Sequence, residues 1–193
     1  MGPASKQYVP ILKARAAEVV ALRSHPRHLD VTPYFEIQNA GTPANDPATG
    51  LPKRGKSAVT DASYFLDDIA RLWDEDLYLD VSRVADPSER ELWWQLITSL
   101  SALNPLKGAI IPALAEGDPS EAWEAAAPLA SLAGRAAMRI SLPHANPVTL
   151  FSTLANAANL VRLPASKIDV ILDWGDEMEA KVATLDNLTR IRE

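Results

Sequence analysis

The stretch TPYFEI, residues 32–37, is a short apolar segment that carries a charged side chain, Glu36, near its end. Successive side chains of a strand alternate between its two faces, so Glu36 is expected on the same face as Tyr34. Four other apolar segments have this form: YVPILK (8–13) with Lys13, LYLDVS (77–82) with Asp80, AMRISL (137–142) with Arg139 and IDVILDW (168–174) with Asp173. Charged residues at the inner ends of strands are typical of the mouth of a β/α barrel.

Helical segments separate these strands along the chain. Three helix starts share one signature, a capping side chain followed by proline, at Asp86-Pro87, Asp118-Pro119 and Asn146-Pro147. Strands are predicted near residues 8–12, 31–37, 77–81, 108–114, 136–142 and 168–173, and a last helix near 177–190. Because each crossover holds a helix, the strands are predicted to be parallel.

The charged strand ends favour a barrel over a doubly wound open sheet, whose buried strands usually read as continuous apolar runs. A closed barrel has eight units and typically roughly 250 residues, whereas this chain has 193. We therefore predict a parallel-stranded α/β barrel-like fold of about six βα units, incomplete relative to eight. Residues 1–193 are predicted to form a single domain, with a Pro/Gly-rich loop at 38–60.

Composition limits the function classes. The net charge of −6 and the pI near 5.1 argue against broad nucleic-acid binding and against binding to an anionic membrane. No apolar run reaches the length of a membrane span, and the first residues lack the order of a secretory signal, so a cytoplasmic location is predicted. The chain has no cysteine, which excludes disulfides and thiolate metal sites.

The opening YVPILKARAAEVVAL (8–22), followed by VTPYFEI (31–37), resembles the Beta protein family of phages and bacteria. Members of that family begin with a Tyr-x-Pro-x-Leu-Lys strand and have a Pro-x-x-Glu second strand. The resemblance is carried mainly by the first forty residues, and the later segments LDVS and LDWGDE match only loosely. It implies a TIM-barrel-like fold and a phage-related setting, and it implies no established reaction.

The residue types suggest one chemistry for the predicted mouth. Glu36, Asp80 and Asp173 are candidate ligands of a divalent metal such as Mg²⁺, because carboxylates from separate strands commonly hold this ion. Lys13, Glu36 and Arg139 are candidate ligand-binding residues for a small anionic molecule. Asp80, Arg139, Asp173 and His144, which follows the fifth strand, are candidate catalytic residues. The leading enzymatic interpretation is metal-assisted hydrolysis of a phosphoester in a phosphorylated or nucleotide-like molecule.

Two alternatives stay open. In the first, the charges form an ionic layer in which Lys13 pairs with Glu36, and Arg139 pairs with Asp173 or Asp80. In the second, the protein is a non-catalytic interaction module of a phage or bacterial conflict system. An exposed edge at the last strand would then be covered by a partner protein or by a second copy in a homo-oligomer.

Overall fold

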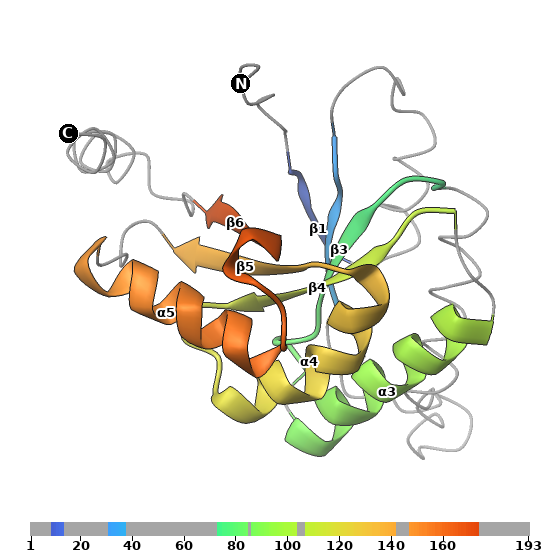
Figure 1. Cartoon of the computed structure of the whole chain (residues 1–193). Helices are drawn as coiled ribbons and strands as arrows, with labels where there is room; N and C mark the ends of the chain where they lie inside the picture. Colours follow the sequence, from blue (N-terminus) through green and yellow to red (C-terminus); the bar gives the residue numbers. More distant parts are fainter. Residues whose placement is uncertain are drawn as a thin grey trace, which may run out of the picture. The chain divides into compact units, whose positions relative to one another are not determined.

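The computed structural model describes residues 9–13, 31–37, 73–84, 86–103, 107–141 and 147–173 (Figure 1). The strands are β1 (Ile11–Lys13), β2 (Tyr34–Glu36), β3 (Leu77–Asp80), β4 (Ile110–Ala115), β5 (Ala136–Ser141) and β6 (Ile168–Asp173). The helices are α3 (Pro87–Leu103), α4 (Ser120–Ala133), α5 (Pro147–Leu160) and the short 3-10 helix η2 (Ala165–Lys167). The predicted loop at 38–60 and the predicted helix at 177–190 lie outside the described residues.

The chain divides into two compact units, residues 1–110 (unit 1) and residues 111–193 (unit 2). In unit 1, β2 pairs in parallel with β1 on one side and with β3 on the other. In unit 2, β5 pairs in parallel with β4 and with β6. The single domain predicted for residues 1–193 stays a prediction.

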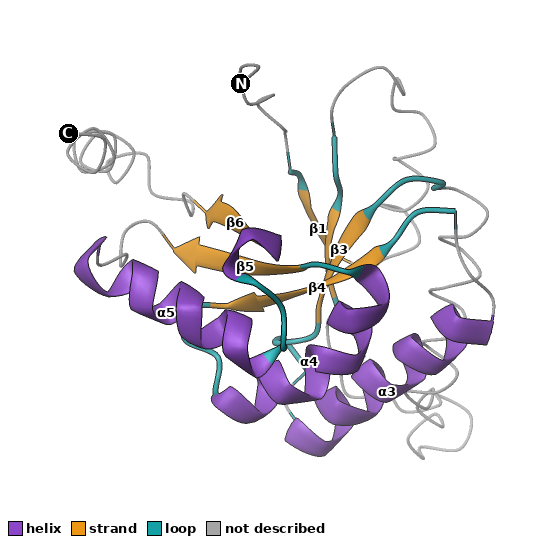
Figure 2. Cartoon of the chain, in the orientation of Figure 1, coloured by secondary structure: helices purple, strands orange, loops and turns teal. Residues whose placement is uncertain are grey.

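Each pair of neighbouring strands consists of strands that are consecutive in the chain. In unit 2, α4 connects β4 to β5, and α5 lies between β5 and β6 along the chain (Figure 2). A doubly wound sheet reverses its strand order at a switch point, whereas a β/α barrel adds its strands in sequence. The order within each unit is the sequential one. The predicted parallel α/β fold of the barrel type is therefore confirmed, and its six described strands are fewer than the eight of a closed barrel.

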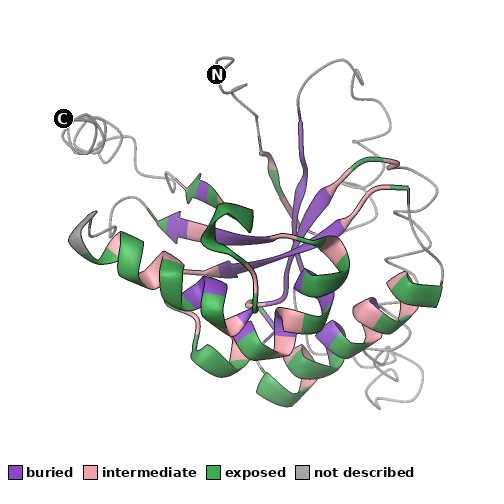
Figure 3. Cartoon of the chain, viewed as in Figure 1, coloured by how far each residue is buried: buried purple, intermediate pink, exposed green. Residues whose placement is uncertain are grey.

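The strands supply most of the buried surface (Figure 3). In β2 and β3 every residue is buried, as expected for parallel strands that are covered on both faces. In unit 2, Met138 and Ile140 of β5 are buried with Trp123 and Leu129 of α4. Figure 1 shows α4 and α5 on the same side of the β4, β5 and β6 strands. One apolar stripe on each helix is thus enough to bury that side of the sheet.

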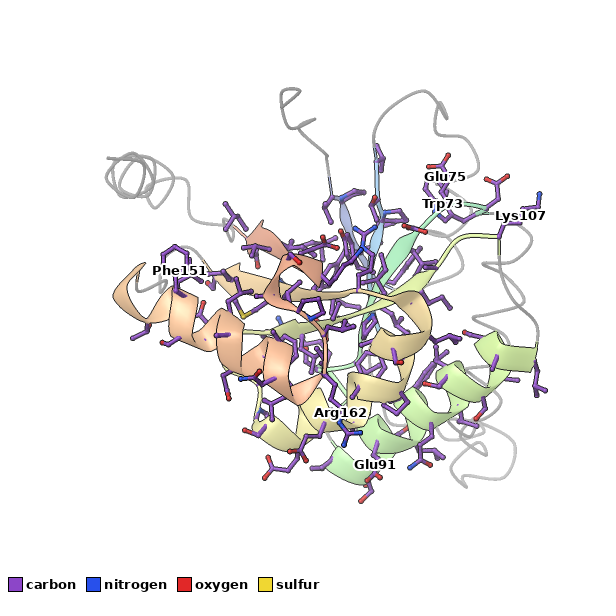
Figure 4. The ribbon with its side chains drawn as sticks, viewed as in Figure 1. Trp73, Glu75, Glu91, Lys107, Phe151 and Arg162 are labelled. Carbon is purple, nitrogen blue, oxygen red and sulfur yellow. The ribbon has the colours of Figure 1, made fainter. Side chains whose placement is uncertain are left out.

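The amino end of β3 is fixed by a close approach of two chain segments. The Asp76 carboxylate accepts a hydrogen bond of 2.9 Å from the Ala109 backbone N–H, and a Cβ atom on Gly108 would lie 2.0 Å from the backbone of Glu75. Trp73 donates its indole N–H to the Asp76 carbonyl. Figure 4 shows the Trp73 and Lys107 side chains at this end of the strand. Only glycine fits at position 108 without a shift of the backbone.

Two of the predicted helix starts can be compared with the structure. Asp86 caps α3 as predicted, because its carboxylate accepts a 2.8 Å hydrogen bond from the Ser88 N–H and Pro87 is the first helical residue. Asp118 differs from the prediction. Its carboxylate accepts a hydrogen bond from the Ala115 N–H at the end of β4, and α4 begins two residues later, at Ser120. The acid there closes the turn after the strand, and Pro119 is the N-cap residue instead of the first helical residue.

The ends of α4 and α5 use the same left-handed backbone conformation with different residues. Gly134 follows α4 with φ of 70°, and Arg162 follows α5 with φ of 58°. After α5, the Leu163 N–H bonds to the Ala158 carbonyl and the Arg162 N–H bonds to the Asn159 carbonyl. This is the Schellman pattern, which normally places glycine where Arg162 stands. Arg162 therefore has a left-handed backbone conformation, which is energetically unfavourable for any residue with a Cβ atom.

We expect Arg162→Gly to stabilise the protein by roughly 0.5 to 1 kcal/mol, because glycine removes the left-handed strain at some cost in unfolded-chain entropy. Gly134→Ala is the matched reverse change and should destabilise by about 1 kcal/mol, since no atom within 4 Å of the added Cβ offers compensation. Thermal unfolding of the two variants checks both signs. Equal shifts of the melting temperature in the same direction would contradict the assignment of left-handed strain to Arg162.

Candidate functional site

Three charged residues form one row across unit 1. Lys13, Glu36 and Asp80 are the last residues of β1, β2 and β3, and their Cα atoms are register partners. Ligand sites of parallel α/β proteins lie at the carboxyl ends of the strands. Of the two acids in this row, Glu36 is 7% exposed and Asp80 is 1% exposed. The row thus places two buried carboxylates side by side at the carboxyl end of the sheet.

Asp80 is held by hydrogen bonds to both carboxylate oxygens. The hydroxyl of Tyr34, which is fully buried, donates to Oδ2 over 2.7 Å. The backbone N–H of Ser82 donates to Oδ1 over the same distance. A buried carboxylate without such donors would cost several kcal/mol, so these bonds are what allow an acid at this position. Asp80 is therefore a fixed group whose orientation is set by the β2 tyrosine and by its own loop.

Tyr34 lies on the predicted face of the sheet. It is two residues before Glu36 on β2, and its register partner is Tyr78 of β3. The two rings are 6.3 Å apart between centroids and tilted by 40°. The Tyr34–Tyr78 pair thus adds apolar contact area next to the row, and the Tyr34 hydroxyl donates its hydrogen bond to Asp80.

Glu36 has a cationic neighbour that sequence reasoning missed. The Nε atom of Arg83 lies 3.9 Å from Oε1 of Glu36, and the Arg83 side chain is 63% exposed. Arg83 stands in the loop between β3 and α3, three residues after Asp80. Arg83 could have been found from the sequence by its position, because it lies in the loop that follows the carboxyl end of a strand. Barrel proteins carry their functional residues in such loops.

In unit 2, Arg139 of β5 binds Asp173, the last residue of β6. Nε and Nη2 of Arg139 both donate to Oδ2 of Asp173, over 3.0 and 2.6 Å. The two side chains are 16% and 20% exposed, so the pair is mostly withdrawn from water. This contact is the Arg139–Asp173 pairing of the ionic-layer alternative.

The same kind of contact recurs four residues earlier in each segment, between Arg135, which directly precedes β5, and Asp169 of β6. Nε and Nη2 of Arg135 donate to Oδ2 of Asp169 over 2.9 and 2.6 Å. The two side chains are 32% and 34% exposed, about twice as much as in the Arg139–Asp173 pair. Sequence reasoning missed the Arg135–Asp169 pair, although both residues lie four positions before a predicted site residue and thus on the same face of their strands.

The structure groups the five predicted charges as a row of three in unit 1 and a pair in unit 2. That all five line one mouth stays a prediction, as do the assigned catalytic and metal roles. His144 lies outside the described residues. In the part of the chain that the structure describes, no group of three or more His, Cys, Asp and Glu side chains is placed to hold a metal ion.

We expect Tyr34→Phe to destabilise the protein by about 1 to 3 kcal/mol, because it leaves one oxygen of the buried Asp80 without its donor. Ser82→Ala is the control, since the bond from Ser82 comes from its backbone N–H and survives the change. Urea unfolding measures both variants. Equal midpoints for the two would show that the Tyr34 hydroxyl does not stabilise Asp80.

The Arg139–Asp173 and Arg135–Asp169 pairs have nearly the same hydrogen-bond distances, so the effect of burial on their contribution to stability can be compared. Arg139→Ala should cost more stability than Arg135→Ala, because it leaves the more buried acid without its cation. We expect about 1 to 3 kcal/mol for Arg139→Ala and below about 1 kcal/mol for Arg135→Ala. Urea unfolding at low and high salt measures the difference, and a larger loss for Arg135→Ala would contradict the ranking.

Comparison with known proteins gives one match. A family model described as Beta protein matches residues 8–192. The match extends over nearly the whole chain, well beyond the first forty residues that carry the resemblance in the sequence. No curated protein and no solved structure matches the chain. Among the described residues, no helix combines the length and the apolar character needed to cross a membrane.

Proposed function

The chain belongs to the Beta protein family, and from this premise we propose that it binds a small phosphorylated or nucleotide-like molecule at the carboxyl ends of β1, β2 and β3. The proposed reaction is metal-assisted hydrolysis of a phosphoester. The observation that carries the proposal is the in-register row of Lys13, Glu36 and Asp80, with two of its members buried acids.

Stability alone does not account for two buried carboxylates at neighbouring strand ends. Apolar residues of similar volume would usually be equal or better there, because each buried charge loses its hydration. Asp80 needs a tyrosine hydroxyl and a backbone N–H to be tolerated. Groups that are costly to bury and lie at the ligand-binding end of a parallel sheet are candidates for function.

The donor set suits a hard divalent cation. Mg²⁺ in phosphoryl-transfer sites is commonly held by one or two carboxylates, by waters and by the phosphate of the substrate. Glu36 and Asp80 are the two acids that would hold it here. When bound, the ion would supply positive charge against the phosphoryl oxygens and lower the pKa of a bound water.

Other residues of the chain orient the carboxylate and bind the ligand's negative charge. Tyr34 and the Ser82 N–H orient Asp80, so this carboxylate needs no reorganisation when a ligand arrives. Lys13 ends the neighbouring strand and is the proposed cation for the ligand's negative charge. The catalytic roles of Arg139, Asp173 and His144 stay predictions from the sequence.

Glu36→Gln tests the proposal, because it removes the charge while keeping the shape of the side chain. Calorimetric titration of Mg²⁺ and Mn²⁺ should show a binding heat with the unmodified protein and at least about tenfold weaker binding with Glu36→Gln. Glu121→Gln, an exposed acid in the first turn of α4, is the control and should bind like the unmodified protein. Release of nitrophenol from bis-nitrophenyl phosphate, with the same ions present, reports the hydrolysis.

Equal metal binding by Glu36→Gln and the unmodified protein would contradict the site. Absence of any heat in both would contradict the enzymatic proposal and favour the second candidate.

The second candidate is a non-catalytic interaction module of a phage or bacterial conflict system. Exposed apolar side chains in unit 2 favour it: Val170 and Leu172 on β6 are 43% and 38% exposed, and Phe151 on α5 is 69% exposed (Figure 4). A partner protein or a second copy would cover them. The cytoplasmic location, the link to phages and the lack of broad nucleic-acid binding remain predictions from the sequence.

A further inference from the structure

Next to the row of Lys13, Glu36 and Asp80, the loop between β3 and α3 carries the exposed side chain of Arg83. We propose that Arg83 is a second anion-binding residue of this site beside Lys13, that it holds a phosphate group of the ligand, and that Glu36 orients it. This inference rests on the proposed function, since it names the group that recognises the ligand. Neither the charged strand ends nor the family match points to Arg83.

The backbone on both sides of Arg83 is fixed. Val81 and Val84 are 2% and 1% exposed, and the Val84 N–H donates to the Val81 carbonyl over 3.0 Å. The preceding residue, Ser82, donates its N–H to the Asp80 carboxylate. Two buried valines and one carboxylate thus anchor a tight turn from which the Arg83 side chain projects into water. A ligand that binds Arg83 does not have to order this loop, which lowers the entropic cost of binding.

The guanidinium of Arg83 is available for a ligand. In the part of the chain that the structure describes, its one partner is Glu36, at 3.9 Å between Nε and Oε1. That distance is longer than a hydrogen bond, and an ion pair with one exposed member contributes little to stability. An arginine in this state keeps its planar set of N–H donors, which matches two oxygens of a phosphate.

Arg139, the arginine chosen from the sequence for this task, is less available. Its Nε and Nη2 already donate to Asp173 over 3.0 and 2.6 Å, and the pair is mostly buried. A phosphate would have to displace a charge-assisted contact there. At Arg83 it would only add to a long contact with Glu36, and Glu36 would continue to hold the guanidinium in place.

The chain provides a matched control. Lys107 lies 3.9 Å from Asp74, the same separation as Arg83 from Glu36, and its side chain is 81% exposed. Lys107 belongs to the same unit and stands near the amino end of β3, away from the carboxyl ends of the strands (Figure 4). Removing its charge changes the net charge of unit 1 as much as removing that of Arg83.

The test is calorimetric titration of pyrophosphate into the full chain with EDTA present, so that no divalent metal contributes. Arg83→Gln should weaken binding by at least about tenfold, because both N–H contacts and the charge are lost. Arg83→Lys should bind with intermediate affinity, since it keeps the charge and loses the bidentate geometry. Lys107→Gln should bind like the unmodified protein. Circular dichroism confirms that each variant is folded.

Three results would overturn the inference: no binding of pyrophosphate by the unmodified protein, equal binding by Arg83→Gln, or an equal loss with Lys107→Gln. Failure here is distinguishable from failure of the proposed function. If Glu36→Gln abolishes metal binding while Arg83→Gln leaves pyrophosphate binding intact, the metal site stands and Arg83 is not its anion group. If pyrophosphate binding depends on Arg83 and no metal binds, the hydrolytic proposal fails and anion recognition stands.

Discussion

Parallel register at the ends of β1, β2 and β3 is the constraint on which the candidate site depends. Because Lys13, Glu36 and Asp80 are register partners, the side chains of Glu36 and Asp80 meet on one face of the sheet. A shift of one residue in the β2–β3 pairing would turn one of the two acids to the opposite face. The bond from Tyr34 to Asp80 joins neighbouring strands and exists only in this register.

In unit 2, charged side chains near the strand ends are stabilised in a different way, by pairing with each other. Two Arg–Asp contacts, four residues apart, join β6 to β5 (Arg139) and to the residue directly before β5 (Arg135). In each, one carboxylate oxygen accepts from two guanidinium nitrogens. Each joins residues that are not direct register partners, since Arg139 is opposite Ile171 and Asp169 is opposite Ala137. These four charges of unit 2 are therefore paired with one another, whereas in unit 1 Arg83 keeps a long contact and a mostly exposed side chain. This contrast makes the row in unit 1 the better place for a ligand.

The family match and the strand order agree on the type of fold. Chains that add parallel strands in sequence build the barrel type of α/β protein, and such proteins carry their chemistry at the carboxyl ends of the strands. A common fold supports many reactions, so the fold predicts the end of the sheet at which a site lies and does not name the reaction. The reaction has to be argued from Glu36, Asp80 and Arg83.

The sequence by itself determined the six strands, their parallel direction and the charged residues that end β1, β2, β3 and β6, because alternation, capping prolines and strand length are local properties. β6 has the predicted bounds, and Asp86 caps α3 as expected. Only the tertiary structure decided the partners: Tyr34 for Asp80, Arg83 for Glu36, and Arg135 for Asp169. These pairs join residues that are 34 to 47 positions apart, and their contact depends on register and on loop conformation, which no local pattern encodes.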